Sequence, residues 1–217
     1  YGLVGSEMCI RDRIVEANKK FIIIGNMNAI TYKEVFPLIK ANKMWLGYSI
    51  HSGDREFEVP NDYPLAAAGW RIDENGRKFI RVKGVRWFTN IDHGRRHEPL
   101  PLMTMADNLR FSKHKELKGK TAYDRYDNYD AIEVPFTDAI PSDYDGVMGV
   151  PISFLDKYCP EQFEILGITD RQNTSGVRTK KYTATDSPKY NDLNARSVIK
   201  IGERYIPMYA RLLIRRL

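Results

Sequence analysis

A short apolar run at residues 21–25 (FIIIG) is the feature that most constrains the fold of this chain. A β-branched run of this length, without alternation, is typical of a strand buried on both faces in a parallel sheet. Asn26 and Asn28 follow directly, where the expected strand ends. Ligands of open α/β sheets bind outside the carboxyl ends of the strands. The two asparagines therefore stand where a site is expected.

A helix is expected after this strand, because Thr31 and Glu34 have the T-x-x-E spacing of a capping box. The helix is predicted to run towards Asn42. Pro37 lies inside it and has no backbone N–H to donate, so a kink or a restart is expected there. A buried strand, a polar turn and a capped helix make half of a βαβ unit, which predicts an α/β fold.

Strand patterns follow the expected helix, at residues 44–50, 69–72, 78–82 and 85–91. The second and third runs flank a turn that contains Asn75 and Gly76, which is a strong hairpin signal. The fourth run carries Trp87 and Phe88, which must face opposite sides because neighbouring strand positions alternate. An α/β segment followed by a hairpin predicts an antiparallel finish to a mainly parallel sheet.

The second half of the chain is expected to be mostly β and rich in loops. Residues 123–130 (YDRYDNYD) cluster tyrosine and aspartate without a core periodicity, which predicts an ordered surface loop. Residues 147–168 hold enough apolar side chains for a second small core. The strand patterns within residues 197–214 predict a terminal β-hairpin with basic residues interleaved.

The 217-residue chain carries a formal net charge of +6, and its positive charge is concentrated near the C-terminus. Residues 171–217 contain 11 basic and 3 acidic residues, whereas residues 1–170 contain 23 basic and 25 acidic ones. This asymmetry favours a polyanionic partner such as nucleic acid, although a basic tail can also be merely solvated.

Missing motifs exclude several kinds of site. The sequence has no G-x-G-x-x-G, no G-x-x-x-x-G-K-[ST] and no G-x-S-x-G, which argues against a nucleotide-phosphate cradle and a serine nucleophile. His93 and His97 are interpreted as surface histidines, because Gly94 intervenes and no cysteine lies at metal-ligand spacing. Two cysteines are too few for a zinc site or a disulfide scaffold, so no metal and a reducing, cytoplasmic setting are expected. The apolar runs are too short to span a membrane.

Seven stretches of the sequence resemble, in order along the chain, the EcoRI-type adenine-specific DNA methyltransferase family. They are residues 21–40, 44–48, 85–92, 126–132, 144–158, 160–168 and 212–216. The fifth stretch, YDGVMGVPISFLDKY, carries the densest likeness. The resemblance extends over residues 14–217.

The resemblance implies transfer of a methyl group from S-adenosylmethionine to N6 of adenine in double-stranded DNA, as part of restriction-modification. Such enzymes bind the cofactor on a Rossmann-like sheet, require no metal, and turn the adenine out of the helix against aromatic side chains. Family members hold the N6 amine with an Asn-Pro-Pro-Phe motif. The implied fold is α/β: the C-terminal part of a Rossmann-like S-adenosylmethionine-dependent methyltransferase sheet with an appended, mostly β target-recognition region.

Two parts of the family pattern are missing from this sequence. It contains neither Asn-Pro-Pro-Phe nor the glycine-containing cofactor loop, both of which belong upstream of residue 21. Residues 1–13 resemble a translated sequencing-adaptor remnant and are expected to be a non-native leader. We therefore expect a truncated enzyme, with the end of the methyltransferase domain at residues 14–97 and the target-recognition, DNA-binding region at residues 98–217. With the catalytic motif and most of the cofactor site absent, the chain alone is expected to be inactive.

The resemblance also implies roles for residues that remain. Asn26 and Asn28 are expected to line the target-base pocket, and either Trp87 or Phe88 is expected to stack on the adenine. Eight basic residues are candidates for contacts with DNA phosphates or guanine: Arg178, Lys180, Lys181, Arg196, Arg204, Arg211, Arg215 and Arg216.

Two other functions stay open. One is a non-catalytic DNA-binding specificity module. The other is a restriction endonuclease, which needs acidic metal ligands; Glu133 and Asp156 are weak substitutes for them. An upstream extension of the reading frame with Asn-Pro-Pro-Phe supports the enzyme, whereas a natural start codon near Ile14 supports the module.

Overall fold

The first sheet of the computed structural model contains β1 (Ile22–Asn26), β6 (Val85–Thr89) and β2 (Trp45–Leu46), in the order β1-β6-β2. The structure describes residues 15–48, 55–65, 69–170 and 177–217. Both β1 and β2 pair antiparallel with β6, so they run parallel to each other on either side of it. The antiparallel strand expected at residues 85–91 is confirmed, and so is a strand after the first helix, although it is shorter than residues 44–50 and its predicted end lies outside the described residues.

Strand β1 is not buried on both faces, and that prediction is wrong for the described chain. Within the described ranges β1 has one strand neighbour, the antiparallel β6. The side chain of Ile23 packs against the core, whereas Ile22 and Ile24 on the other face are 60% and 46% exposed. A β-branched apolar run favours a strand, but its burial depends on which elements cover each face of the sheet.

The helix after β1 also differs from the prediction. The chain forms the 3₁₀ helix η1 (Met27–Thr31) and then the short helix α2 (Phe36–Lys40). Thr31 ends η1, and its hydroxyl donates a hydrogen bond to the carbonyl of Asn28 at 2.9 Å, so the expected capping box does not form. Pro37 lies in the first turn of α2, where a missing N–H costs nothing. The restart expected at this proline is therefore confirmed.

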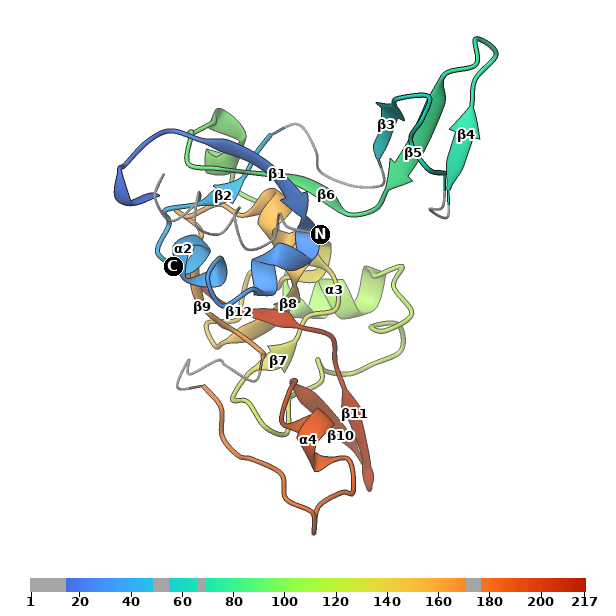
Figure 1. Cartoon of the computed structure of the whole chain (residues 1–217). Helices are drawn as coiled ribbons and strands as arrows, with labels where there is room; N and C mark the ends of the chain where they lie inside the picture. The colour runs from blue at the N-terminus through green and yellow to red at the C-terminus, as the bar shows by residue number, and fades with distance from the viewer. Residues whose placement is uncertain (1–14, 49–54, 66–68, 171–176) are drawn as a thin grey trace.

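A three-stranded antiparallel sheet lies between β2 and β6 in the sequence and projects from the body of the molecule (Figure 1). It contains β3 (Arg55–Val59), β5 (Lys78–Val82) and β4 (Trp70–Ile72), in the order β3-β5-β4. The hairpin expected around Asn75 and Gly76 joins β4 to β5 and is confirmed. We refer to residues 55–84 as the arm.

The second large sheet has the order β7-β8-β12-β9. Its strands are β7 (Ile132–Glu133), β8 (Met148–Pro151), β9 (Phe163–Ile168) and β12 (Arg211–Arg216). Strand β12 is antiparallel to both of its neighbours, and its residues Leu212, Leu213 and Ile214 are fully buried. The terminal hairpin is formed by β10 (Val198–Ile201) and β11 (Arg204–Pro207) alone. The run at residues 209–214 therefore does not belong to that hairpin, contrary to the prediction.

The remaining helices are short and connect the sheets. They are η2 (Gly94–His97), α3 (Met105–Phe111), η3 (Thr137–Ala139), η4 (Ile152–Lys157) and α4 (Tyr190–Leu193). No helix in the described ranges is long and apolar enough to cross a membrane.

One large apolar cluster joins the first sheet to the second. It includes Phe21, Ile39 and Phe88 from the N-terminal side and Phe154 and Phe163 from the C-terminal side. Residues 147–168 therefore contribute to this shared core and do not form a separate one. The contact between residues before and after 97 therefore includes this shared apolar core and the buried ion pair of Arg86 with Asp156.

The tyrosines of residues 123–130 do not lie on a surface loop. Tyr123, Tyr126 and Tyr129 are all buried, and the hydroxyl of Tyr123 donates to the carbonyl of Ala139 at 2.6 Å. The three rings point into the core, whereas the aspartates that follow them pair with lysine or arginine. A sequence alternating tyrosine with aspartate looks polar throughout, so the prediction missed these core positions.

Candidate nucleic-acid interface

The carboxyl end of β1 is fixed to the start of β6 by Asn26. Its side-chain oxygen accepts the Asn28 N–H at 2.9 Å, and its side-chain nitrogen donates to the carbonyl of Lys83 at 3.0 Å. The Met27 N–H also donates to the carbonyl of Gly84 at 2.7 Å. Asn26 therefore holds the base of the arm against η1. Asn28 is exposed, and no partner of its side-chain amide is found in the described part of the chain.

Trp87 and Phe88 lie on opposite faces of the first sheet, as the alternation of β6 requires. Phe88 is buried in the core, and its ring comes within 3.1 Å of the position a Cβ on Gly25 would take. Trp87 is half-buried and pairs with Ile24 on the other face, the face that also carries Asn26. The structure thus brings Asn26 and Trp87 to one face at the carboxyl end of β1 and removes Phe88 from it.

Arg211, one of the DNA-binding candidates, lies in a buried polar network. Its Nε and Nη2 donate to Oε1 of Glu133 at 3.0 and 2.8 Å, and the two side chains are only 12% and 4% exposed. The hydroxyl of Tyr126 also donates to Glu133. Burial, together with the adjacent Glu133 carboxylate, holds the pKa of Tyr126 well above its usual value. These contacts join β7 to β12 and leave Arg211 unable to reach a ligand outside.

The network is possible because β8 has a glycine beside it. A Cβ on Gly149 would lie 2.1 Å from the hydroxyl oxygen of Tyr126. Any larger residue at this buried position would displace the tyrosine from Glu133.

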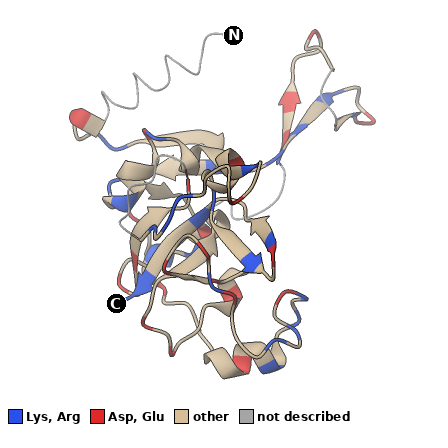
Figure 2. Cartoon of the chain, turned by 90° about the horizontal axis from the view of Figure 1, so that it is seen from below, with Lys and Arg blue, Asp and Glu red and all other residues tan. Residues whose placement is uncertain are grey.

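Five more of the candidate cations have partners within the protein. The carboxylate partners are Asp127 for Lys180 at 2.5 Å, Asp192 for Arg196 at 3.2 Å and Glu164 for Arg215 at 2.7 Å. Arg178 and Arg216 donate to the carbonyls of Asn194 and Ser142. Figure 2 shows the same intermixing of basic and acidic residues over the whole ribbon.

Lys181 and Arg204 are the two candidates that remain. Both are exposed, and neither has an ion-pair partner in the described ranges. Four of the eight candidates are thus paired with carboxylates and two more donate to backbone carbonyls, so Lys181 and Arg204 are the candidates without a partner in the described ranges.

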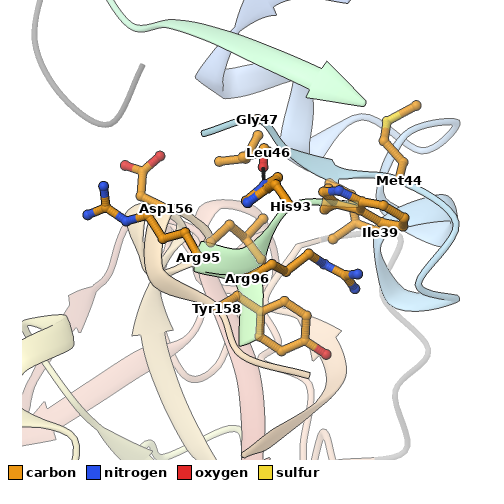
Figure 3. A pocket seen from close by; sticks show the side chains of 11 residues that line it. Ile39, Met44, Leu46, Gly47, His93, Arg95, Arg96, Asp156 and Tyr158 are labelled. Atoms are coloured by element: carbon orange, nitrogen blue, oxygen red, sulfur yellow. Dashed lines mark hydrogen bonds between the residues drawn. The ribbon is translucent and has the colours of Figure 1, made fainter. Parts of the chain in front are cut away.

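An enclosed pocket lies between β2, η2 and η4 (Figure 3). The guanidinium of Arg96 lies 3.8 Å from the centroid of the Trp45 ring, and His93 Nε2 lies 3.0 Å from the carbonyl oxygen of Leu46. The cavity measures about 20 Å³. A space of that size holds about one water molecule, so neither a nucleoside cofactor nor a purine fits. The pocket is therefore part of the framework that holds η2 on the sheet.

The carboxylates considered for an endonuclease are both held by arginines. Glu133 is held by Arg211, as described above, and Asp156 accepts two hydrogen bonds from Arg86 at 2.8 and 2.9 Å. In the part of the chain that the structure covers, no group of three histidine, cysteine, aspartate or glutamate side chains is placed to bind a metal ion.

His97 forms a link that the sequence did not reveal. Its Nε2 lies 3.0 Å from the Asp92 carboxylate, and its Nδ1 lies 2.7 Å from Oε1 of Glu161. The hydrogen bonds with Asp92 and Glu161 raise the pKa of His97 above its ordinary value, and His97 in turn lowers the pKa of both carboxyls. Asp92 precedes η2 and Glu161 follows η4, so His97 ties the two halves of the chain together. His97 is a surface histidine, as expected. Its partner Glu161 lies 64 residues further along the sequence, so the sequence did not predict this contact.

Comparison with known protein families identifies the family of this chain. A family model described as "Adenine-specific methyltransferase EcoRI" matches residues 10–217. The chain belongs to this family. The resemblance read from the seven stretches of sequence is thereby confirmed for the EcoRI-type methyltransferases.

Three curated relatives are named as Type II methyltransferases. The chain is 48% identical over 155 residues to Type II methyltransferase M.EcoRI of Escherichia coli, covering 71% of this chain and 44% of the relative. It is 36% identical over 157 residues to Type II methyltransferase M.MgeORF184P of Mycoplasma genitalium, covering 71% and 46%. It is 32% identical over 155 residues to Type II methyltransferase M.MpnI of Mycoplasma pneumoniae, covering 70% and 45%.

The matched part of this EcoRI-type chain therefore spans about half the length of the curated relatives. No solved structure matches it.

Proposed function

We propose that this chain is the C-terminal part of a DNA methyltransferase that transfers a methyl group from S-adenosylmethionine to N6 of adenine in duplex DNA. The observation that carries the proposal is the family match over residues 10–217. In this proposal, residues 14–97 end the methyltransferase domain and residues 98–217 form the target-recognition region. Residues 1–13 remain a proposed non-native leader.

The open side of β1 supports a continuation of the first sheet. Ile22 and Ile24 expose apolar surface on a strand that has a neighbour on one side only in the described chain. An exposed apolar strand edge tends to pair with another strand. A preceding part of the protein that adds a strand beside β1 would pair its free edge, and a helix packed on that face would cover Ile22 and Ile24 and give β1 the burial its sequence favours. The result would be a Rossmann-like sheet in which β6 is antiparallel and β2 forms the far edge.

The residues present do not form a site for S-adenosylmethionine. The pocket beside β2 has room for about 20 Å³, and the two larger hollows, of about 310 and 400 Å³, lie beside Asp138 and not at the carboxyl end of a strand of the first sheet. The sequence also lacks the glycine-containing cofactor loop of the family. We therefore assign the cofactor site, with the methyl donor it holds, to a part of the protein outside this chain. No catalytic step is assigned to a residue of this chain.

The residues at the carboxyl end of β1 have roles in holding the target base. Trp87 offers a half-buried ring on the same face as Asn26, and a flipped adenine gains stacking energy on such a ring. Asn28 is exposed and offers an amide to a base edge. Asn26 acts through position, because its own amide holds η1 and the arm together. Phe88 supports the sheet from the core.

Methylation by the extended protein tests this function. The reading frame is extended upstream, the extended protein is incubated with duplex DNA and labelled S-adenosylmethionine, and N6-methyladenine is measured by mass spectrometry. The extended protein is expected to form N6-methyladenine, whereas the 217-residue chain binds DNA without methylating it. Absence of N6-methyladenine with the extended protein would contradict the proposal.

A tryptophan pair provides the matched test of the base pocket. In the extended protein, Trp87→Ala is expected to reduce methylation by about 5- to 150-fold, the range of one lost base–aromatic stack. Trp70→Ala is the control, because Trp70 is an exposed tryptophan on the arm. Equal effects of the two substitutions would show that Trp87 does not stack on the target base.

The second candidate is a DNA-binding specificity module without catalysis. It is favoured by the absence of an Asn-Pro-Pro-Phe motif from the sequence. A natural start codon near Ile14, with DNA binding but no methyl transfer by the intact protein, would establish this second function.

A further inference from the structure

The hairpin β10–β11 projects from the end of the molecule opposite the arm (Figure 1). Its strands are joined by a two-residue turn, Gly202–Glu203, and Gly202 has a φ of +59°. Glycine at the first position of a two-residue turn matches the right-handed twist of the two strands. Ile201 and Arg204 lie directly opposite each other beside this turn. The hairpin is thus a narrow, well-defined two-stranded ribbon.

The ribbon is anchored at its base and free at its tip. Ile199, at the base, is buried against Tyr126 and Tyr129 of the body. By strand alternation Ile199 shares its face with Ile201 and Ile206, which are 58% and 40% exposed. The face of the ribbon that packs on the body at the base of the ribbon is therefore exposed to solvent at its tip.

The opposite face of the ribbon rests on a small core of its own. Tyr205 contacts Tyr182 with ring centroids 5.2 Å apart, and Leu193 of α4 and Val198 complete the cluster. This packing fixes the direction in which the ribbon projects. A rigid support of this kind is what an element that reads a partner requires.

Arg204 at the tip is free, in contrast to most of the basic residues nearby. It is exposed and has no ion-pair partner in the described ranges, whereas Lys180, Arg196 and Arg215 are paired with carboxylates. Lys200 is exposed on the other face of the ribbon, over the ring of Tyr205 at 5.2 Å, and Lys181 and Lys189 are exposed in the preceding segment that packs on that face. The tip thus presents a free guanidinium between two exposed isoleucines, with positive charge around it.

We propose that the tip of β10–β11 enters the major groove of the DNA and reads base edges, with Arg204 contacting guanine. The inference rests on the proposed function and names the reading element within it. A two-stranded ribbon fits the major groove, arginine forms a bidentate pair with O6 and N7 of guanine, and apolar side chains contact the thymine methyl group.

Glu203 favours base edges over the phosphate backbone. A carboxylate at the end of the turn is repelled by phosphates, but in the major groove it accepts a hydrogen bond from the cytosine amine. An arginine preceded by a glutamate at the tip therefore suits contacts with base edges better than contacts with phosphates alone.

The arm also carries arginines, but two of them are held by carboxylates. Its Arg71 donates to Glu56 at 2.8 and 2.9 Å, and Arg77 donates to Asp73 at 2.7 Å. These two arginines are therefore neutralised within the arm, whereas Arg204 has no carboxylate partner in the described ranges.

Selection from a pool of random duplexes tests the inference with the 217-residue chain. At low salt, the chain is expected to enrich a motif that contains guanine. Arg204→Ala should lose preference at one guanine position by about 5- to 150-fold, the range of one bidentate base contact. Arg204→Lys keeps the charge but not the planar fork, and it should lose most of the same preference. Lys181→Ala is the matched control and should weaken binding evenly across sequences.

The outcomes separate this inference from the proposed function. If the chain binds duplex DNA but Arg204→Ala keeps every preference, or if no motif is enriched, the reading role of the ribbon is overturned and the methyltransferase proposal stands. If the chain binds no duplex even at low salt, the proposed DNA-binding region itself fails. If Arg204→Ala instead changes the sedimentation of the chain without DNA, the ribbon is a protein interface and the inference is wrong.

Discussion

Replacing Arg211 is expected to destabilise the fold and not merely to weaken DNA binding. The side chains of Arg211 and Glu133 are 12% and 4% exposed and share two hydrogen bonds at 2.8 and 3.0 Å. Arg211→Met leaves the buried carboxylate without its counter-charge. Removing one partner of a buried ion pair costs about 3–5 kcal/mol. For a chain of this size, that cost lowers the melting temperature by about 6–20 °C.

Thermal unfolding followed by circular dichroism measures this loss, and the same strand supplies the control. Arg215 on β12 is paired with Glu164, but both of these side chains are about half exposed. Arg215→Met is therefore expected to cost only about 0–1 kcal/mol. The double variant Arg211→Met/Glu133→Gln should be more stable than the sum of the two single effects predicts, because the second substitution removes the unpaired charge.

The reasoning fails if Arg211→Met melts within about 4 °C of the wild-type chain, the range expected for the control. It also fails if the double variant loses the full sum of the single effects. In either case Arg211 would again be a candidate for contact with DNA.

Two further predictions concern the first sheet and the link between the two halves. Phe88→Ala should cost about 3–5 kcal/mol of stability in urea unfolding because it empties a core site, and a smaller loss for Phe88→Ala than for Trp87→Ala would contradict the observed burial. His97→Gln tests the pH dependence. The pKa of His97 is raised above 6.5 in the folded state, so the stability it contributes is complete near about pH 6 and is lost as the pH rises through the raised value. Melting curves at about pH 6 and about pH 9 measure this loss, and a wild-type advantage over His97→Gln that grew with pH would disprove the link.

The parts of the fold that could be predicted depend on interactions between residues close in sequence. Asn75-Gly76 predicted the β4–β5 hairpin, and Pro37 predicted a helix restart, because turn geometry and a missing N–H act locally. The alternation of Trp87 and Phe88 also followed from the sequence alone. The family could be recognised for another reason, since long stretches of matching residues are specific whatever their structure.

The candidate site was less predictable, because each side chain there is used according to what the rest of the chain places beside it. Asn26 was chosen for a pocket, yet its amide holds a turn 57 residues away in sequence. Arg211 was chosen for DNA, but a carboxylate 78 residues earlier holds it in a buried pair. Local patterns do not encode such partners, since they arise only when distant strands pair.

The sequence by itself thus determined the family, the turns and which residues of a strand share a face. Tertiary structure alone decided which face is covered, which charges are neutralised and which arginine stays free. The physical reason is that burial and ion pairing are properties of two or more segments brought together by folding. Alternation and turn geometry, in contrast, are properties of a single segment.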